Sequence, residues 1–292
     1  IGINHNGKMS LAKKLLISAA KSGVNAVKFQ TYITEKRVKK NSPIFDILKN
    51  CELKFKEFKE LQDIAIEKNV EFFSTPFDDE SLDFLNSIKV NIIKIASFDT
   101  VNLKFLRKIS RLRKSIIMSV GMSNLNEINK AYKILSKNNP NIALLHCISS
   151  YPTKESDANL NCLDRLKNNF DCVIGQSDHT NDIYVPLLAV ANGAQIIEKH
   201  FKINNMKCAD APVSIDQYQM KRMITEIRRI EKIFGKDNLG IRESEKNASF
   251  YKDKKFKVIF IKKNSEKYER IQVTIKSNDK KFIIYSIDGI ID

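Results

Sequence analysis

Histidine occurs only four times in this sequence, each time in the same kind of position. His5, His146, His179 and His200 each end or directly follow a short run of β-branched and apolar residues. A single histidine at a strand end is more often structural than reactive. In a (β/α)8 barrel, however, the carboxyl ends of the strands build the active-site face, so four such histidines favour one shared site.

Two of these histidines are placed to bind one metal ion. His179 and His200 end strands that follow one another in the chain, and adjacent strands lie only about 4.8 Å apart. Two imidazoles completed by oxygen ligands suit Mn²⁺, Fe²⁺, Co²⁺ or Zn²⁺. Glu198 lies on the same side of its strand as His200, and we expect so close a carboxylate to orient that ring.

A second set of strand-end residues could bind an anion. Lys28 and Lys94 supply point charges, and hydroxyl groups that can donate to phosphate or carboxylate oxygens come from Thr75, Ser97, Ser119 and Ser177. Each serine taken alone is better explained as a turn or cap residue. Their combination with two inward-facing lysines predicts an anion-binding cradle.

The elements that must position these residues alternate in type along most of the chain. Eight β-branched runs predict strands at 1–3, 26–30, 70–74, 91–96, 115–119, 142–146, 172–175 and 194–200. Amphipathic helical patterns lie between them and end with 215–234. Eight β–α pairs predict an α/β fold, a (β/α)8 TIM barrel over residues 1–235. The alternative, a doubly wound open sheet, usually has a glycine-rich turn after its first strand, and Gly7 alone does not make one.

The pattern changes after Gly235. Residues 236–253 are polar and resemble a linker, and three alternating runs at 257–262, 271–276 and 282–286 predict strands. We therefore expect a small all-β domain over residues 254–292. Because so small a unit buries little surface, it should pack on the barrel or on a second subunit.

Composition argues against several classes of protein. The net charge of +16 is spread along the chain without a basic block containing aromatics, which argues against nucleic-acid binding. No apolar run is long enough for a membrane span, and no signal segment opens the sequence, so a cytoplasmic location is expected. The five cysteines are scattered without a C-x-x-C pair, which fits reduced thiols.

Eight short stretches make the sequence resemble the sialic acid synthase family, whose members build N-acetylneuraminic, legionaminic and pseudaminic acids from phosphoenolpyruvate. In chain order they read IGINHNG (1–7), VKFQ (27–30), FSTPFD (73–78), KIAS (94–97), SVGM (119–122), HC followed by YPT (146–153), GQSDHT (175–180) and IEKHF (197–201). Any one of them is a weak signal. Eight in family order, spanning residues 1–235, are a strong one.

The resemblance implies a role for each matching residue. His179 and His200 would bind a divalent metal, Mn²⁺ first, with Mg²⁺ or Co²⁺ as alternatives. Phosphoenolpyruvate would be held by Lys28, Thr75, Lys94, Ser97, Ser119 and Ser177. Gln30 and Tyr151 would line the sugar pocket, and Asp210 matches the family's acidic residue after the last strand. Lys28, Lys94, Glu198 and Asp210 are then the candidate catalytic residues.

The implied reaction joins phosphoenolpyruvate to an N-acyl amino-sugar aldehyde. C3 of phosphoenolpyruvate attacks the aldehyde carbon, water adds at C2, and phosphate leaves by C–O cleavage. The family also implies a homodimer, in which a C-terminal antifreeze-like domain lends an arginine to the partner subunit. Arg242 and Arg270 are weak candidates for that arginine, because the family's domain is not recognisable after Lys246.

Two further departures from the family pattern bear on activity. The family's glutamate immediately before Ile-Gly has no counterpart in a sequence that begins at Ile1, so a catalytic acid is expected outside it. Cys208-Ala209-Asp210-Ala211 replaces a Gly-Pro-Asp-His pattern, which leaves sugar specificity open. Two alternatives therefore stand beside the synthase. One is a catalytically impaired, sugar-phosphate-binding barrel, and the other is a metal-dependent barrel hydrolase.

Overall fold

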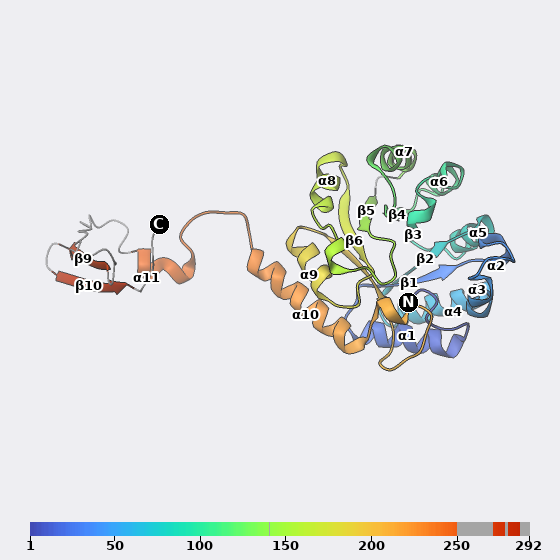
Figure 1. Ribbon diagram of the computed structural model, residues 1–292, viewed down its shortest axis with the longest axis horizontal. Helices are drawn as coiled ribbons and strands as arrows, with labels where there is room; N and C mark the ends of the chain where they lie inside the picture. The colour runs from blue at the N-terminus through green and yellow to red at the C-terminus, as the bar shows by residue number, and fades with distance from the viewer. Residues whose placement is uncertain (140, 250–270, 278–279, 287–292) are drawn as a thin grey trace. The chain divides into compact units, whose positions relative to one another are not determined.

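The computed structural model describes residues 1–139, 141–249, 271–277 and 280–286 (Figure 1). It divides the chain into two compact units, Ile1–Gly235 and Lys236–Asp292, each of which is described by itself. No helix in these ranges is both long and apolar enough to cross a membrane.

The first unit contains one parallel sheet of eight strands that neighbour each other in chain order. The strands are β1 Ala26–Thr31, β2 Glu71–Pro76, β3 Ile92–Ile95, β4 Ser115–Ser119, β5 Ile142–Cys147, β6 Val173–Asp178, β7 Ile196–Phe201 and β8 Ser214–Ile215. Parallel neighbours need a long crossover, and the intervening helices supply it. The sheet curls as in a TIM-like fold, with the helices outside the strands (Figure 1).

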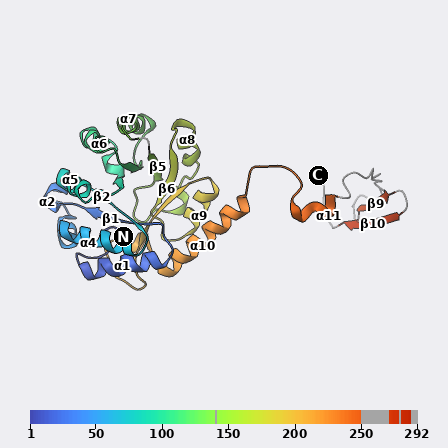
Figure 2. The same cartoon turned by 180° about the vertical axis from the view of Figure 1, so that it is seen from behind.

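The covering helices are amphipathic, except for the apolar helix Tyr184–Ala191. They are α1 Met9–Lys21, α4 Phe55–Glu67, α5 Asp79–Ser87, α6 Leu103–Ser110, α7 Leu125–Ser136, α8 Cys162–Asn169, α9 Tyr184–Ala191 and α10 Gln217–Phe234. Two short helices that we did not predict, α2 Thr34–Arg37 and α3 Phe45–Cys51, follow β1. The first and last helices of this unit, α1 and α10, are in contact and lie side by side in both views (Figures 1 and 2).

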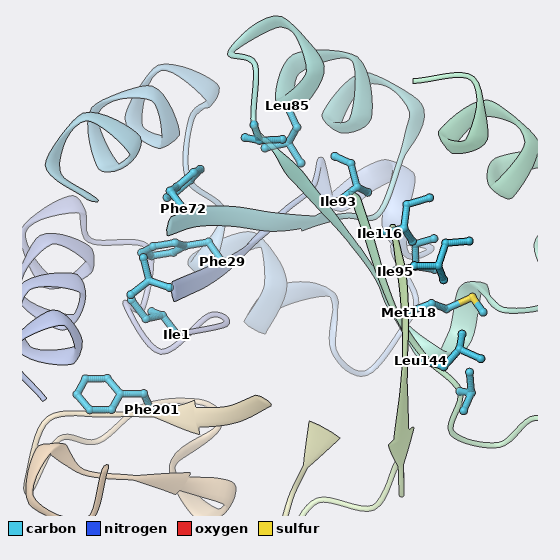
Figure 3. Packing of buried hydrophobic residues seen from close by; sticks show 14 of the residues in the cluster. Ile1, Phe29, Phe72, Leu85, Ile93, Ile95, Ile116, Met118, Leu144 and Phe201 are labelled. Carbon is cyan, nitrogen blue, oxygen red and sulfur yellow. The ribbon is translucent and has the colours of Figure 1, made fainter. Parts of the chain in front are cut away.

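Strand alternation separates the core from the site. In β1 the buried residues are Val27, Phe29 and Thr31, while Lys28 and Gln30 lie on the other side, as their spacing of two predicts. The outer face packs against the helices, where Phe29, Phe72 and Ile93 join the hydrophobic core (Figure 3). Each fully buried side chain of this size contributes about 1.5–3 kcal/mol. The inner face is thus left for polar side chains.

The two edges of the sheet differ from the prediction. The predicted first strand, 1–3, makes only one parallel bridge, between Gly2 and Phe29. Gly2 has a φ of +58°, and the chain turns at once, because the Asn4 amide donates to the Ile1 carbonyl. The eighth strand is instead Ser214–Ile215, although Ile215 was predicted to begin the last helix. A cavity of about 750 Å³ is lined mainly by apolar residues of β1, β7, α9 and α10.

The second unit is described only in part. It contains a short helix, α11 Lys246–Ser249, and an antiparallel pair of strands, β9 Ile271–Ser277 and β10 Lys280–Ser286. These two strands coincide with two of the three predicted ones. The third, 257–262, and Arg270 lie outside the described residues, so the small all-β domain stays a prediction.

Candidate active site

Four polar side chains from four strands meet inside the curled sheet. Ser177 on β6 donates a 2.9 Å hydrogen bond to Glu198 Oε1 on β7. Lys28 Nζ on β1 lies 3.5 Å from the same oxygen, and Lys94 Nζ on β3 lies 3.9 Å from Glu198 Oε2. Strands β1, β3 and β7 are not neighbours in the sheet. Their side chains can touch only because the sheet curls and directs them toward a common interior.

The two lysines differ in burial. Lys94 has 3% of its side chain exposed and donates to Ser119 Oγ at 2.7 Å and to the Ile95 carbonyl at 2.9 Å. Lys28 has 16% exposed. Lys94 is therefore a fixed donor at the base of the group, whereas Lys28 is more accessible.

The surroundings shift the pKa values of this group in opposite directions. Burial lowers the pKa of Lys94 to about 8, although Glu198 opposes the shift. Burial by itself would raise the pKa of Glu198, but Lys28, Lys94 and the Ser177 hydrogen bond outweigh it and hold that pKa at about 2. Glu198 is therefore ionised near neutral pH.

The place of Glu198 corrects one expectation. We expected this carboxylate to orient His200, but its described hydrogen bond and ion pairs are with Ser177, Lys28 and Lys94. The reason is geometric. Residues 198 and 200 share a face but lie two positions apart along the strand, so the lysines directly across the interior are better placed for Glu198.

The remaining predicted anion ligands line the same end of the sheet. Ser97 Oγ accepts a 3.0 Å hydrogen bond from the Gly121 amide. A Cβ at Gly121 would lie 2.7 Å from Ser149 Oγ and 2.8 Å from the Cys147 carbonyl, so this close approach requires glycine. Thr75 is 2% exposed and pairs in register with Gln30 across β1 and β2.

The histidines at the ends of β6 and β7 approach each other. The ring centroids of His179 and His200 are 5.4 Å apart. His179 Nδ1 lies 2.8 Å from the Ile148 carbonyl, and His200 Nδ1 lies 3.2 Å from Asp210 Oδ2, at an angle poor for a hydrogen bond. Burial, helped by His200, lowers the pKa of His179 to about 4. His179 is thus neutral and can donate a lone pair.

This arrangement fits a metal ion in part. Metal-binding histidines usually turn their second nitrogen toward a carbonyl or carboxylate, as both Nδ1 atoms do here, and this leaves each Nε2 as the candidate ligand atom. Within the described residues, however, no three His, Cys, Asp or Glu side chains form a ready ligand set. Oxygens of substrate or water could complete the ligand set around these two rings.

The other two histidines have local partners of their own. His146 Nε2 is 2.7 Å from the Ala158 carbonyl, which gives it a structural partner. His5 is 1% exposed and accepts from the Gly7 amide through Nδ1, and burial lowers its pKa to about 4. Two of the four rings are thus close to each other, and a site shared by all four stays a prediction.

Of the predicted sugar-binding residues, Tyr151 lies beside the histidine pair, and Gln30 lies two residues after Lys28 on β1. The Tyr151 ring centroid is 4.1 Å from that of His179, and 51% of the tyrosine is exposed. Gln30 Oε1 accepts a 3.1 Å hydrogen bond from Arg37 Nη1. The Arg37 guanidinium lies over the Phe77 ring, 3.6 Å from its centroid. Arg37 was not singled out from the sequence, because one arginine among 50 basic residues gives no signal of its own.

Asp210 is held against the histidine pair by the N-terminal segment. Its amide donates to Asn4 Oδ1 at 2.9 Å, and its carbonyl accepts from Ser214 Oγ. Asn4 Nδ2 donates in turn to Ser214 Oγ and to the Phe201 carbonyl. Burial would raise the pKa of Asp210, but His200 and nearby positive charges outweigh it and lower that pKa. A predicted loop residue thus becomes a fixed, ionised group.

Comparison with known proteins agrees with this geometry. The NeuB family model matches residues 15–238. The chain is 40% identical over 264 residues to the N,N'-diacetyllegionaminic acid synthase of Campylobacter jejuni, covering 84% of this chain and 78% of that protein. It is 29% identical over 267 residues to a pseudaminic acid synthase of the same species, covering 86% and 78%. A crystal structure of the N-acetylneuraminic acid synthetase of Leptospira borgpetersenii superposes with a TM-score of 0.83 at 39% identity, over 86% of this chain and 89% of that one.

Proposed function

Since the chain belongs to the NeuB family of phosphoenolpyruvate-condensing, sialic-type acid synthases, we propose that it condenses phosphoenolpyruvate with an N-acyl amino-sugar aldehyde. The observation that carries this proposal is the cluster of Lys28, Lys94, Ser119 and Ser177 directly beside His179 and His200. An anion site and a pair of imidazoles side by side suit one anionic substrate and one carbonyl substrate.

The lysine cluster would hold phosphoenolpyruvate. Lys28 and Lys94 face its negative charges, and the hydroxyls of Thr75, Ser97, Ser119 and Ser177 donate to its oxygens. Glu198 lies within ion-pair distance of both lysines. It is also an ionised carboxylate inside the site, so it can accept the proton of the water that adds at C2.

The histidine pair would hold the metal on which enzymes of this family typically depend. We propose Mn²⁺ bound through His179 and His200, and when bound it would polarise the aldehyde oxygen of the open-chain sugar. Asp210 lies beside His200, where it can stabilise that ring or exchange a proton with the nascent sugar hydroxyl. Gln30 and Tyr151 would contact the sugar itself.

The bonds then change as follows. C3 of phosphoenolpyruvate forms a bond to the aldehyde carbon, and the aldehyde oxygen gains a proton. Water adds at C2 and loses its proton to a base. The bond between C2 and the oxygen that carries phosphorus then breaks. This releases inorganic phosphate and leaves the 2-keto acid. Lys28 and Lys94 stabilise charge on phosphate and carboxylate during these changes.

Three further features belong to this proposal. We propose that the curled sheet forms a closed (β/α)8 barrel, because residues 1–4 contact both β1 and the β7–β8 edge. We also propose that the protein is cytoplasmic, which the substrate class and the five free cysteines support. We propose that it forms a homodimer. Sedimentation equilibrium would test the dimer. We propose residues 254–292 as a small β domain after a linker at 236–253.

The test is turnover with defined substrates. The protein is incubated with Mn²⁺, phosphoenolpyruvate labelled with ¹⁸O at the C2–O–P bridge, and a panel of 2-acylamino sugar aldehydes. We expect phosphate that carries the label and a nine-carbon acid of matching mass with at least one acceptor. Tight phosphoenolpyruvate binding without phosphate release on any acceptor would favour the impaired binding barrel. Phosphate release without a condensed product would favour the hydrolase.

A further inference from the structure

The ends of β6 and β7 carry a pair of residues that the proposed reaction does not use. Three residues of each strand end run side by side, and the alternation of strands assigns them to opposite faces. Ser177 and Glu198 pair in register and meet inside the sheet. The next pair, Asp178 and Lys199, is also in register but faces outward. His179 and His200 follow and face inward again.

The outward pair forms a closed buried network. Lys199 Nζ contacts Asp178 Oδ2 and the Thr180 carbonyl, and the two charged side chains are only 1% and 2% exposed. Thr180 Oγ1 completes the network with a 2.7 Å hydrogen bond to Asp178 Oδ2. Strand alternation places Asp178 and Lys199 on the face opposite to that of Ser177 and Glu198.

Stability alone is a poor explanation for such a pair. Desolvation of two buried charges offsets most of their attraction, and apolar residues of similar size often stabilise a fold equally well. Its position is more informative. Lys199 binds atoms of the residues on both sides of His179, and Lys199 itself directly precedes His200. One ammonium group therefore ties together the backbone that carries both rings.

The His179 backbone is restrained at a third point. Its carbonyl accepts a 2.9 Å hydrogen bond from the Thr153 amide, in the loop that also carries Tyr151. With Lys199 and Asp178 behind the strand end, and Ile148 on the ring nitrogen, His179 has little freedom to move relative to His200.

We propose that Asp178, Lys199 and Thr180 form a clamp that positions His179 and His200 for a divalent metal. They are positioning residues and touch neither substrate nor metal. The inference rests on the proposed function, because it requires those two histidines to be the metal ligands. The clamp sets the separation of the rings from the opposite face of the sheet, and two-histidine sites depend strongly on that separation.

The test uses a variant that removes both charges together. In Asp178→Leu/Lys199→Met the buried pair becomes apolar, so the fold should survive with a melting temperature close to that of the unaltered protein. Metal binding is measured without substrates, as free Mn²⁺ by electron paramagnetic resonance and as the visible d–d spectrum of bound Co²⁺. We expect the Mn²⁺ Kd to rise about tenfold or more, the range for supporting residues at metal sites, and the Co²⁺ bands to shift.

The controls separate this inference from the proposed function. Lys59→Met/Asp63→Leu removes an exposed ion pair of α4 and should leave metal binding unchanged. The single variant Lys199→Arg keeps the charge and should retain most of the Mn²⁺ affinity of the unaltered protein. If the unaltered protein binds Mn²⁺ no better than His200→Ala does, the proposed metal site fails and the clamp with it. If the unaltered protein binds Mn²⁺ and the double variant matches it in Kd and spectrum, the clamp alone is overturned.

A milder variant covers the case in which the double variant does not fold. Thr180→Val keeps the shape of the side chain and removes its hydrogen bond to Asp178. We expect it to fold and to weaken Mn²⁺ binding several-fold, with the phosphoenolpyruvate Kd unchanged. Unchanged Mn²⁺ affinity in this variant would also count against the clamp.

Discussion

Lys94→Met offers the most direct test of the anion cradle. Methionine has nearly the length of lysine and is apolar, so it can fill a position in which only 3% of the side chain is exposed. The change removes donors to Ser119 Oγ and the Ile95 carbonyl and leaves Glu198 with Lys28 as its remaining lysine partner. The fold should tolerate it, since Lys28 still compensates the carboxylate.

The structure sets the size of the effect. Lys28, Lys94 and Glu198 carry two positive charges and one negative charge, a net +1 that the substitution reduces to zero. A hydrogen bond to a charged partner is worth about 1.5–3 kcal/mol. At about 1.4 kcal/mol per factor of ten, the Kd for phosphoenolpyruvate should rise roughly 10- to 100-fold.

The assay is isothermal titration calorimetry with phosphoenolpyruvate alone, without metal or sugar. The chain contains no tryptophan, so intrinsic tryptophan fluorescence is not an option. Lys130→Met, on the exposed face of α7, is the matched control and should bind as the unaltered protein does. A Kd for Lys94→Met within twofold of that of the unaltered protein would refute the argument, and the cradle would then have to lie elsewhere.

Three further predictions test neighbouring parts of the site. Glu198→Gln removes a negative charge from the cradle, so calorimetry should find phosphoenolpyruvate bound about tenfold tighter while turnover falls. The free-energy change of a tenfold effect is well within the ~4 kcal/mol by which unit charges 4 Å apart interact near a protein surface. Weaker binding would contradict this assignment. Because burial lowers the pKa of Lys94 to about 8 and only its protonated form attracts the anion, the phosphoenolpyruvate Kd should be nearly constant just below pH 8 and rise above it by up to tenfold per pH unit; a flat profile to pH 10 would exclude Lys94 as the titrating group. Arg37→Gln frees the Gln30 amide, so steady-state kinetics should show a higher KM for the sugar and an unchanged KM for phosphoenolpyruvate; the reverse pattern would place Arg37 at the anion.

Sequence patterns predict the anion cradle and the histidine pair only in part. Period-two alternation places Lys28 and Gln30 on the inner face of β1, and the burial of Val27 and Phe29 on the outer face agrees. The strand-end positions of His179 and His200 correctly predicted that their rings would meet. Both inferences need only the local geometry of a strand and the order of the parallel strands, and both of these can be predicted from the sequence.

Partner choice across the interior could not be predicted in the same way. Glu198 was expected at His200 and instead faces Lys28 and Lys94, because the curl of the sheet brings β1 and β3 opposite β7. His146 lies near the end of β5 as predicted, whereas His5 lies in a turn, and each has its own local partner. The edge of the sheet was also misjudged, since a glycine at positive φ ends the pairing of residues 1–3 after one bridge.

The sequence by itself therefore determined the order of strands β1 to β7 and of the longer helices between them, the inner face of β1 and the set of side chains available for chemistry. The tertiary structure alone decided which of these touch: Glu198 with the lysines, Arg37 with Gln30, and Lys199 with Asp178 behind the histidines. The physical reason is range. Periodicity is set by neighbours a few residues apart, whereas these contacts join residues from 7 to 170 positions apart and depend on the register and curl of the whole sheet.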